Sequence, residues 1–325
     1  MTSLIDIPEI KVGDLVGFAD WVELIGLLVE DGTISQAEIA DVLLTSGLYG
    51  AEPRELFPGD EGAAEEGDLT SDDPAFRFVE RIWNHLALRQ DLLGEIYPFQ
   101  VEFDILKRIP STWSDVPSFT QVLLTAHTAR YCKEVIVERL NSMSFRQLFE
   151  KVVQAAGHGL FGGPASRFGV PREPGWPTRV NERVERFAEE LGLSVLRRDL
   201  AETPGDRTLD VAMRVEVGGD PSGALIFLTQ CATGRHWEEK RGEPTLQEWR
   251  DVLMWKGMIV RSVAIPWWFN GSEEYDRYFR YFDEALVLDR RRLLAGRPDE
   301  YLANDVRDII LEWWEAQMAR LPTLE

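Results

Sequence analysis

The sequence predicts an α/β protein: a mixed β-sheet packed against helices, with a mostly helical region before it and a helical extension after it. Between residues 144 and 268 the hydrophobic pattern follows the order helix, helix, strand, strand, strand, helix, strand. The segment GGDPSG at 218–223 is a strong turn signal between two apolar runs. Acidic residues concentrate in the first half of the chain. We therefore expect three parts: an acidic helical region at 1–140, an α/β core at 144–270 and a helical extension at 271–325.

The acidic region is expected to contain helices at 18–49, 74–95 and 117–140, because apolar side chains recur there at helical spacing. The short run VEFDIL at 101–106 suits either a strand or the start of a helix. Between the first two helices, residues 51–73 are rich in Glu, Asp, Gly and Ala, which predicts a solvated loop or linker.

A segment of this region, ISQAEIADVL, has some character of a helix-turn-helix, and Ser35 and Glu38 within it fit a capping box. Its acidic surroundings argue against DNA reading, and paired helices of this kind also occur in interaction domains. We therefore do not expect this segment to read DNA.

The elements of the central part follow from capping and turn signals. Ser144 is suited to cap a helix over 144–156, and Gly192 to end the next one. A Thr245/Glu248 capping box opens a later helix. In chain order we expect a helix at 144–156, a Gly- and Pro-rich loop at 157–177, a helix at 178–192, strands at 193–198, 208–217 and 224–232, a helix at 245–256, a strand at 261–268 and mostly helix from 272.

Charge and composition exclude several classes of function. The net charge of −21 is uneven: residues 1–140 hold 26 acidic and 10 basic residues, which leaves 30 acidic and 25 basic residues in the remainder. Such an acidic surface repels nucleic acid, so chemistry on DNA belongs in the second half or needs a partner. The sequence contains neither a membrane-length apolar stretch nor a signal-peptide pattern. Cys132 and Cys231 make no disulfide framework, and the Cys231–His236 pair is too little for zinc. We expect a cytoplasmic protein.

The hairpin around 218–223 brings polar residues into an apolar sheet. If its turn is centred between Asp220 and Pro221, Asp210 faces Cys231, one position from Gln230. Gly-rich turns often carry bulges, so the turn length is open by one residue. We therefore expect Asp210 and Gln230 to be neighbours on adjacent strands. An Asp among apolar strand residues is costly to bury unless a partner such as a metal ion or a Lys pairs with it. Gln230 ends its strand, where a simple strand-end hydrogen bond is the alternative role.

An acidic residue on one hairpin strand and a (Asp/Glu/Gln)-x-Lys motif on the next resemble the PD-(D/E)xK, or restriction-endonuclease-like, nuclease superfamily. The match covers roughly 144–268 and is carried by Glu150 in LFEKV, Asp210 in TLDVA and Gln230 in TQCA, with Gln in the second motif as in Mrr-like members. The resemblance implies that Glu150, Asp210 and Gln230 bind Mg²⁺ or Mn²⁺. Carboxylate and amide oxygens are hard ligands, which suit these ions. Glu182 and Glu185 are alternatives for the helical acid.

The chain departs from the family pattern at the lysine, since position 232 holds Ala232. The resemblance makes Lys240, in GRHWEEK, the candidate migrated lysine that orients the attacking water; an ion pair along a helix is its alternative role. Arg235, Arg241 and Trp237 are candidate DNA contacts, with packing the alternative for Trp237. The cluster Arg290–Arg292 could contact phosphate or end a helix.

These observations predict a Mg²⁺-dependent endonuclease acting on DNA, and family analogy places it in a bacterial phage-defence or restriction system. The acidic first half predicts a partner protein, such as an ATPase or targeting subunit. The alternative is a catalytically inactive nuclease fold that serves as an interaction subunit, which Ala232 favours. An acidic DNA mimic is a weaker alternative, because it needs no Asp/Gln hairpin. The sequence leaves open whether the chain forms a homo-oligomer.

Overall fold

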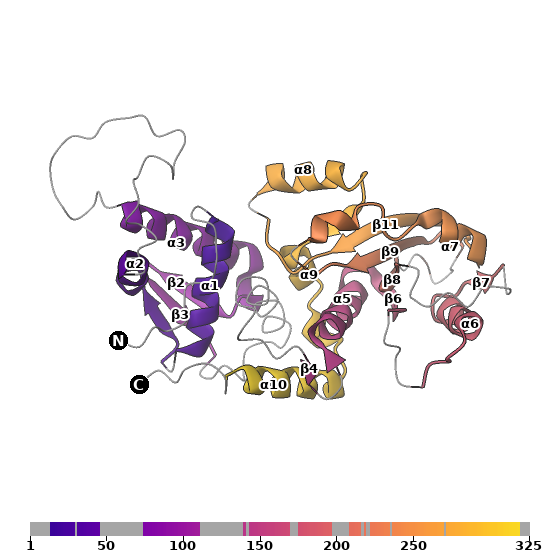
Figure 1. The fold of residues 1–325 in the computed structure, drawn as a ribbon, viewed down its shortest axis with the longest axis horizontal. Coiled ribbons are helices and arrows are strands. Elements are labelled where there is room, and N and C mark those ends of the chain that lie inside the picture. The colour runs from indigo at the N-terminus through magenta and orange to yellow at the C-terminus, as the bar shows by residue number, and fades with distance from the viewer. Residues whose placement is uncertain are drawn as a thin grey trace. The chain divides into compact units, whose positions relative to one another are not determined.

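The computed structural model describes residues 14–29, 31–45, 74–110, 139–140, 143–169, 175–196, 208–215, 218, 222–234, 236–269 and 271–318. The chain forms two compact units, the first built mainly from residues up to Pro117 and the second mainly from Glu138–Trp313. Figure 1 traces both units along the chain. The predicted loop at 51–73 and most of the predicted helix at 117–140 lie outside the described residues.

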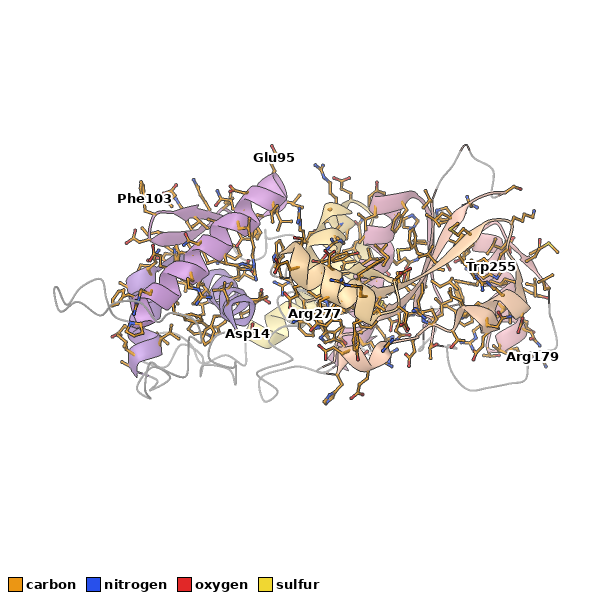
Figure 2. The ribbon with its side chains drawn as sticks, turned by 90° about the horizontal axis from the view of Figure 1, so that it is seen from above. Asp14, Glu95, Phe103, Arg179, Trp255 and Arg277 are labelled. Atoms are coloured by element: carbon orange, nitrogen blue, oxygen red, sulfur yellow. The ribbon has the colours of Figure 1, made fainter. Side chains whose placement is uncertain are left out.

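The first unit combines helices with a small antiparallel sheet of order β1-β3-β2. Asp14 caps its first helix by accepting a hydrogen bond from the Gly17 amide, and the capping box of Ser35 and Glu38 is present. The run VEFDIL forms a hairpin whose exposed tip, Phe103, is visible in Figure 2. The elements are α1 (Leu15–Leu28), β1 (Thr33–Ser35), α2 (Gln36–Thr45), α3 (Pro74–Leu93), η1 (Gly94–Ile96), β2 (Phe99–Glu102) and β3 (Ile105–Arg108).

A buried charge network lies in the core of the first unit. The Arg89 guanidinium on α3 is 2.6 Å from Asp20 and 2.8 Å from Glu23, both on α1. The Tyr97 hydroxyl donates a hydrogen bond of 2.7 Å to Glu23. These ion pairs compensate the cost of removing the three charges from water, so they tie α1 to α3.

The second unit is built on a five-stranded mixed sheet of order β12-β11-β9-β8-β6. Strands β6, β8 and β9 pair antiparallel, whereas β9, β11 and β12 pair parallel. The fold class predicted from the sequence, α/β with a mixed sheet, is therefore confirmed at this level. Its strands are β6 (Gly162–Arg167), β8 (Val211–Val215), β9 (Leu225–Cys231), β11 (Met258–Ala264) and β12 (Leu286–Leu288).

Helices and short strands surround this sheet. Helix α5 packs against β6, β8 and β9, and its Gly157 allows close approach to Met213 of β8. The sheet residues Ala212, Ile226 and Leu228 pack into a core that α6 and α7 share. The further elements are β4 (Arg139–Leu140), β5 (Met143–Ser144), α5 (Phe145–Phe161), α6 (Val180–Glu190), β7 (Ser194–Val195), η4 (Trp237–Lys240), α7 (Leu246–Val252), β10 (Leu253–Met254), α8 (Ser272–Tyr281), α9 (Arg290–Ala295), η5 (Pro298–Glu300) and α10 (Asn304–Met318).

Two strands of the main sheet differ from the sequence prediction. The segment expected to be a loop from 157 continues α5 to Phe161 and then forms β6. Pro164 is tolerated there because β6 is an edge strand and its register shifts between Gly162 and Ala165. The segment after 272, expected to be mostly helical, contributes β12 to the opposite edge.

Capping and register follow the prediction in part. The Ser144–Gln147 capping box opens α5, and Gly192 follows α6 with a φ of 69°. The Thr245 side chain makes no capping hydrogen bond, so that predicted box is wrong. In the hairpin Val211 pairs with Thr229, which places Asp210 opposite Gln230 instead of Cys231. The register with Cys231 is wrong by one residue, whereas the expected proximity of Asp210 and Gln230 across the hairpin is confirmed.

Candidate functional site

A cluster of buried charges joins the first turns of α5 to the start of β8. The capped start of α5 presents Arg146 and Glu150 one helical turn apart, on the same helix face. The Arg146 guanidinium donates from Nε to Glu150 Oε1 at 3.1 Å and from Nη2 to Asp210 Oδ1 at 3.1 Å. One side chain thus bridges the two carboxylates that the sequence singled out, and the structure brings Glu150 and Asp210 together.

Asp210 is held in place by the neighbouring strand β9. Its amide donates to the Thr229 carbonyl at 3.1 Å, and its Oδ2 accepts from the Cys231 amide at 2.7 Å. The carboxylate is fully buried. A backbone amide and a guanidinium are strong donors to an ionised carboxylate, which explains how an Asp is accommodated inside an apolar sheet.

Glu150 has a second cationic partner on the edge strand. The guanidinium of Arg167, on β6, donates from Nε to Glu150 Oε2 at 2.7 Å, and its Nη2 lies 2.6 Å from the same oxygen. The next loop passes directly over this carboxylate, because a Cβ added at Gly169 would lie 2.5 Å from Glu150 Oε2. Glycine at this position therefore leaves room for the buried carboxylate.

The electrostatics of the cluster disfavour full ionisation of both acids. Burial and the neighbouring Asp210 carboxylate raise the pKa of Glu150 to about 7, against the opposing effect of Arg167 and Arg146. Burial, together with the Asp210 and Glu150 carboxylates, also raises the pKa of the Cys231 thiol well above its usual value. Glu150 is thus a carboxyl group that can exchange a proton near neutral pH.

Gln230 is buried at the end of β9, next to Cys231, whose amide contacts Asp210. Its Nε2 donates to the Cys231 carbonyl at 3.5 Å. Its Oε1 is buried and has no hydrogen-bond partner among the described residues. A buried carbonyl oxygen without a donor is costly, and it is the kind of atom that a bound cation or water satisfies.

Lys240 does not reach this cluster. Its ammonium is 3.0 Å from Glu243 Oε2, an i,i+3 pair at the end of η4, and its side chain is partly exposed. Within the described part of the chain this is the carboxylate that Lys240 contacts. Lys240 therefore has the ion-pair role that was given as its alternative. The position at which the family has its lysine is occupied by Ala232, which is buried.

The candidate DNA contacts have other roles in this structure, and Arg235 lies outside the described residues. Arg241 pairs with Asp283 at 2.6 Å and lies over the ring of Tyr281. Trp237 is buried and stacks on Phe282 with ring centroids 5.5 Å apart, so it packs as a core residue.

The alternative acids and the arginine cluster lie apart from these contacts. Glu182 and Glu185 are exposed on α6, where they help line a hollow of about 570 Å³. At the start of α9, Arg290 is buried and donates to the Pro266 carbonyl, whereas Arg292 pairs with Asp289, the helix N-cap. The structure thus brings Glu150, and not Glu182 or Glu185, to Asp210.

The donors that could hold a divalent cation are the carboxylates of Glu150 and Asp210 and the unpartnered Oε1 of Gln230. These are hard oxygen ligands, which suit Mg²⁺ and Mn²⁺. Both carboxylates are engaged by guanidinium groups, and no group of three or more His, Cys, Asp or Glu side chains with metal-binding geometry occurs among the described residues. The donor chemistry fits the ion once a carboxylate oxygen is released from its arginine.

Sequence reasoning missed three members of the cluster: Arg146, Arg167 and Gly169. Arg146 gave one usable signal, since it precedes Glu150 by four residues on a capped helix. Arg167 and Gly169 gave none, because they lie within the segment 157–177, which was expected to be a loop.

Comparison of the chain with protein-family models, with curated proteins and with solved structures finds no match. No helix in the described ranges has the length and apolar character needed to cross a membrane.

Proposed function

We propose that the second unit is a metal-dependent endonuclease that hydrolyses DNA phosphodiester bonds. The observation that carries this proposal is the bridge by Arg146, which brings the carboxylates of Glu150 and Asp210 within reach of one guanidinium. The site holds two buried carboxylates, one on a helix and one at the start of a strand, beside a glutamine with an unpartnered Oε1. Burial of these groups costs free energy of desolvation that a purely structural core would avoid. Perturbed carboxyl groups of this kind favour a functional site.

The order of the elements supports the restriction-endonuclease-like version of this proposal. Helix α5 is followed by the antiparallel strands β6, β8 and β9, then by α7 and by β11, which pairs parallel with β9. The resemblance to restriction-endonuclease-like nucleases predicts this order of elements. It also predicts that the acids, Glu150 and Asp210, lie on the helix and on the middle strand. The insertion of α6 and β7 between β6 and β8 adds to that order without changing the sheet.

The chemistry assigned to each residue follows from its position. Glu150, Asp210 and Gln230 would hold Mg²⁺ or Mn²⁺, which when bound lowers the pKa of a coordinated water and draws charge from the phosphate oxygens. Asp210 is fixed by the Cys231 amide and so offers one rigidly placed oxygen. Glu150, which is buried and paired with Arg146 and Arg167, would offer a second carboxylate oxygen to the ion.

One observation favours a second candidate, a catalytically inactive nuclease fold that serves as an interaction subunit. Both carboxylates are ion-paired with arginines, and Lys240 pairs with Glu243 away from them. An internal salt-bridge network of this type would hold α5, β6 and β8 together without any ligand.

The acidic first part of the chain supports a partner protein for either candidate. Residues 1–140 carry most of the net charge, and this charge would repel DNA unless a partner covers or directs the chain. An ATPase or a targeting subunit of a phage-defence or restriction system, acting in the cytoplasm, is the partner class that fits. This setting rests on the family analogy.

Cleavage of supercoiled and linear DNA in Mg²⁺ or Mn²⁺ tests the proposal. The wild type is compared with Asp210→Asn, which keeps the shape of the side chain, and with Asp251→Asn, an exposed helix carboxylate, as the matched control. We expect wild type and control to cut and Asp210→Asn to lose at least about 100-fold in rate. Calorimetric titration with Mn²⁺ accompanies the assay. Absence of both cleavage and Asp210-dependent Mn²⁺ binding would refute the nuclease proposal and leave the inactive candidate.

A further inference from the structure

Arg146 is the exposed member of the charge cluster. The side chains of Glu150 and Asp210 are 0% exposed and that of Arg167 is 2% exposed, whereas that of Arg146 is 49% exposed. A molecule approaching the two carboxylates from solvent therefore meets the Arg146 guanidinium first. This position on the open side of the site is where a substrate phosphate would have to lie.

The site also needs a cation that the sequence motif does not provide. Position 232 holds a buried alanine, and the ammonium of Lys240 is paired with Glu243. Arg167 is enclosed by the protein and so cannot contact a substrate from its present position. Arg146 remains as the basic group that touches both carboxylates and solvent.

We propose that Arg146 is the phosphate-contacting residue of this site and fills the role of the missing lysine. In the free protein its guanidinium neutralises Glu150 and Asp210; when nucleic acid and metal ion bind, it turns outward to a phosphate and releases carboxylate oxygens to the ion. The inference rests on the proposed function, because it assigns a substrate contact to the same site.

Charge counting supports this exchange. When both acids are ionised, as metal binding requires, the two carboxylates and the two guanidinium groups form a neutral set. A divalent ion added while Arg146 stays in place would lie next to two cations, and their repulsion is strong in a site shielded from water. Movement of Arg146 to a phosphate removes this repulsion. A guanidinium also matches phosphate geometry with paired donors, as it matches a carboxylate.

The exchange predicts opposite effects of one substitution on two measurements. Arg146→Ala should tighten Mn²⁺ binding to the full-length chain without DNA by about tenfold, measured by calorimetry, because the competing cation is gone. The same variant should weaken binding of a short DNA duplex in Ca²⁺ and reduce the slope of its salt dependence by about one. Arg146→Lys keeps a point charge, so both of its binding constants should lie between those of wild type and Arg146→Ala. This variant serves as the test if the alanine variant does not fold.

Arg186→Ala is the matched control, because Arg186 is 48% exposed and makes an i,i+4 ion pair with Glu190 of the same kind. It should change neither measurement. If Mn²⁺ binds through Asp210 but Arg146→Ala binds it no more tightly, Arg146 is structural and this inference is wrong while the proposed nuclease stands. If neither wild type nor variant binds Mn²⁺, the inference and the proposed function both fail.

Discussion

Replacement of Glu150 with glutamine should remove most of the pH dependence of stability that this cluster causes. In the folded protein the pKa of Glu150 is raised from 4.5 to about 7 by burial and by the Asp210 carboxylate. In the unfolded chain it returns to the ordinary value. The folded state therefore binds more protons between these two values, so ionisation of Glu150 favours unfolding.

The sign and size of the effect follow from linkage. The stability associated with protonated Glu150 is fully present below about pH 4.5 and is lost as the pH rises through about 7. At about 1.4 kcal/mol for each unit of pKa difference, the loss amounts to about 3 kcal/mol. Glu150→Gln resembles the protonated acid and should not show this loss.

The assay is denaturant unfolding between about pH 5 and about pH 8, followed through hydrogen exchange of the α5 amides. These amides report on the second unit alone. The free energy of unfolding of wild type should fall relative to Glu150→Gln by about 3 kcal/mol across this range. Glu189→Gln, at an exposed position on α6, controls for the loss of a negative charge. Parallel curves for wild type and Glu150→Gln would refute the electrostatic account of the cluster.

Three further substitutions test the packing around the same carboxylate. Arg167→Ala leaves Glu150 with one cation fewer in a buried site and should lower the free energy of unfolding by about 3 to 5 kcal/mol, measured by denaturant unfolding. Gly169→Ala places a Cβ 2.5 Å from Glu150 Oε2 and should cost about 1 to 3 kcal/mol in the same measurement; an unchanged midpoint would mean that the loop can move. Ser144→Ala removes the N-cap of α5 and should cost about 1 kcal/mol, seen as earlier exchange of the first α5 amides.

The sequence predicted those parts of the site that depend on local signals. Ser144, as an N-cap residue, predicted the helix that carries Glu150. Asp210 stood out because it is a charged residue within an apolar run. The hairpin was found, but its register differed by one residue, because a Gly-rich turn does not fix the number of residues it contains. For the same reason the sequence narrowed the residue opposite Asp210 to Gln230 or Cys231 without deciding between them.

The remaining parts depend on contacts between distant segments. Arg167 is 17 residues from Glu150 in sequence, and a lone arginine after a Gly- and Pro-rich stretch looks like a surface residue. The strand β12 has only three residues, too few to show an alternating pattern between charged neighbours. It becomes a strand because β11 offers it an unpaired edge.

The close approach of α5 and α9 decides where the second unit can be cut for separate study. A Cβ at Gly159 would collide with the carbonyl of Gly296, and one at Gly296 with the carbonyl of Ala156, so the two backbones touch. A fragment ending at residue 270 would lose this contact together with β12, and β11 would become an unprotected sheet edge prone to self-association. A fragment intended for crystallisation or for isotope labelling should therefore extend through α10 to Met318, because the second unit continues to Trp313 within that helix.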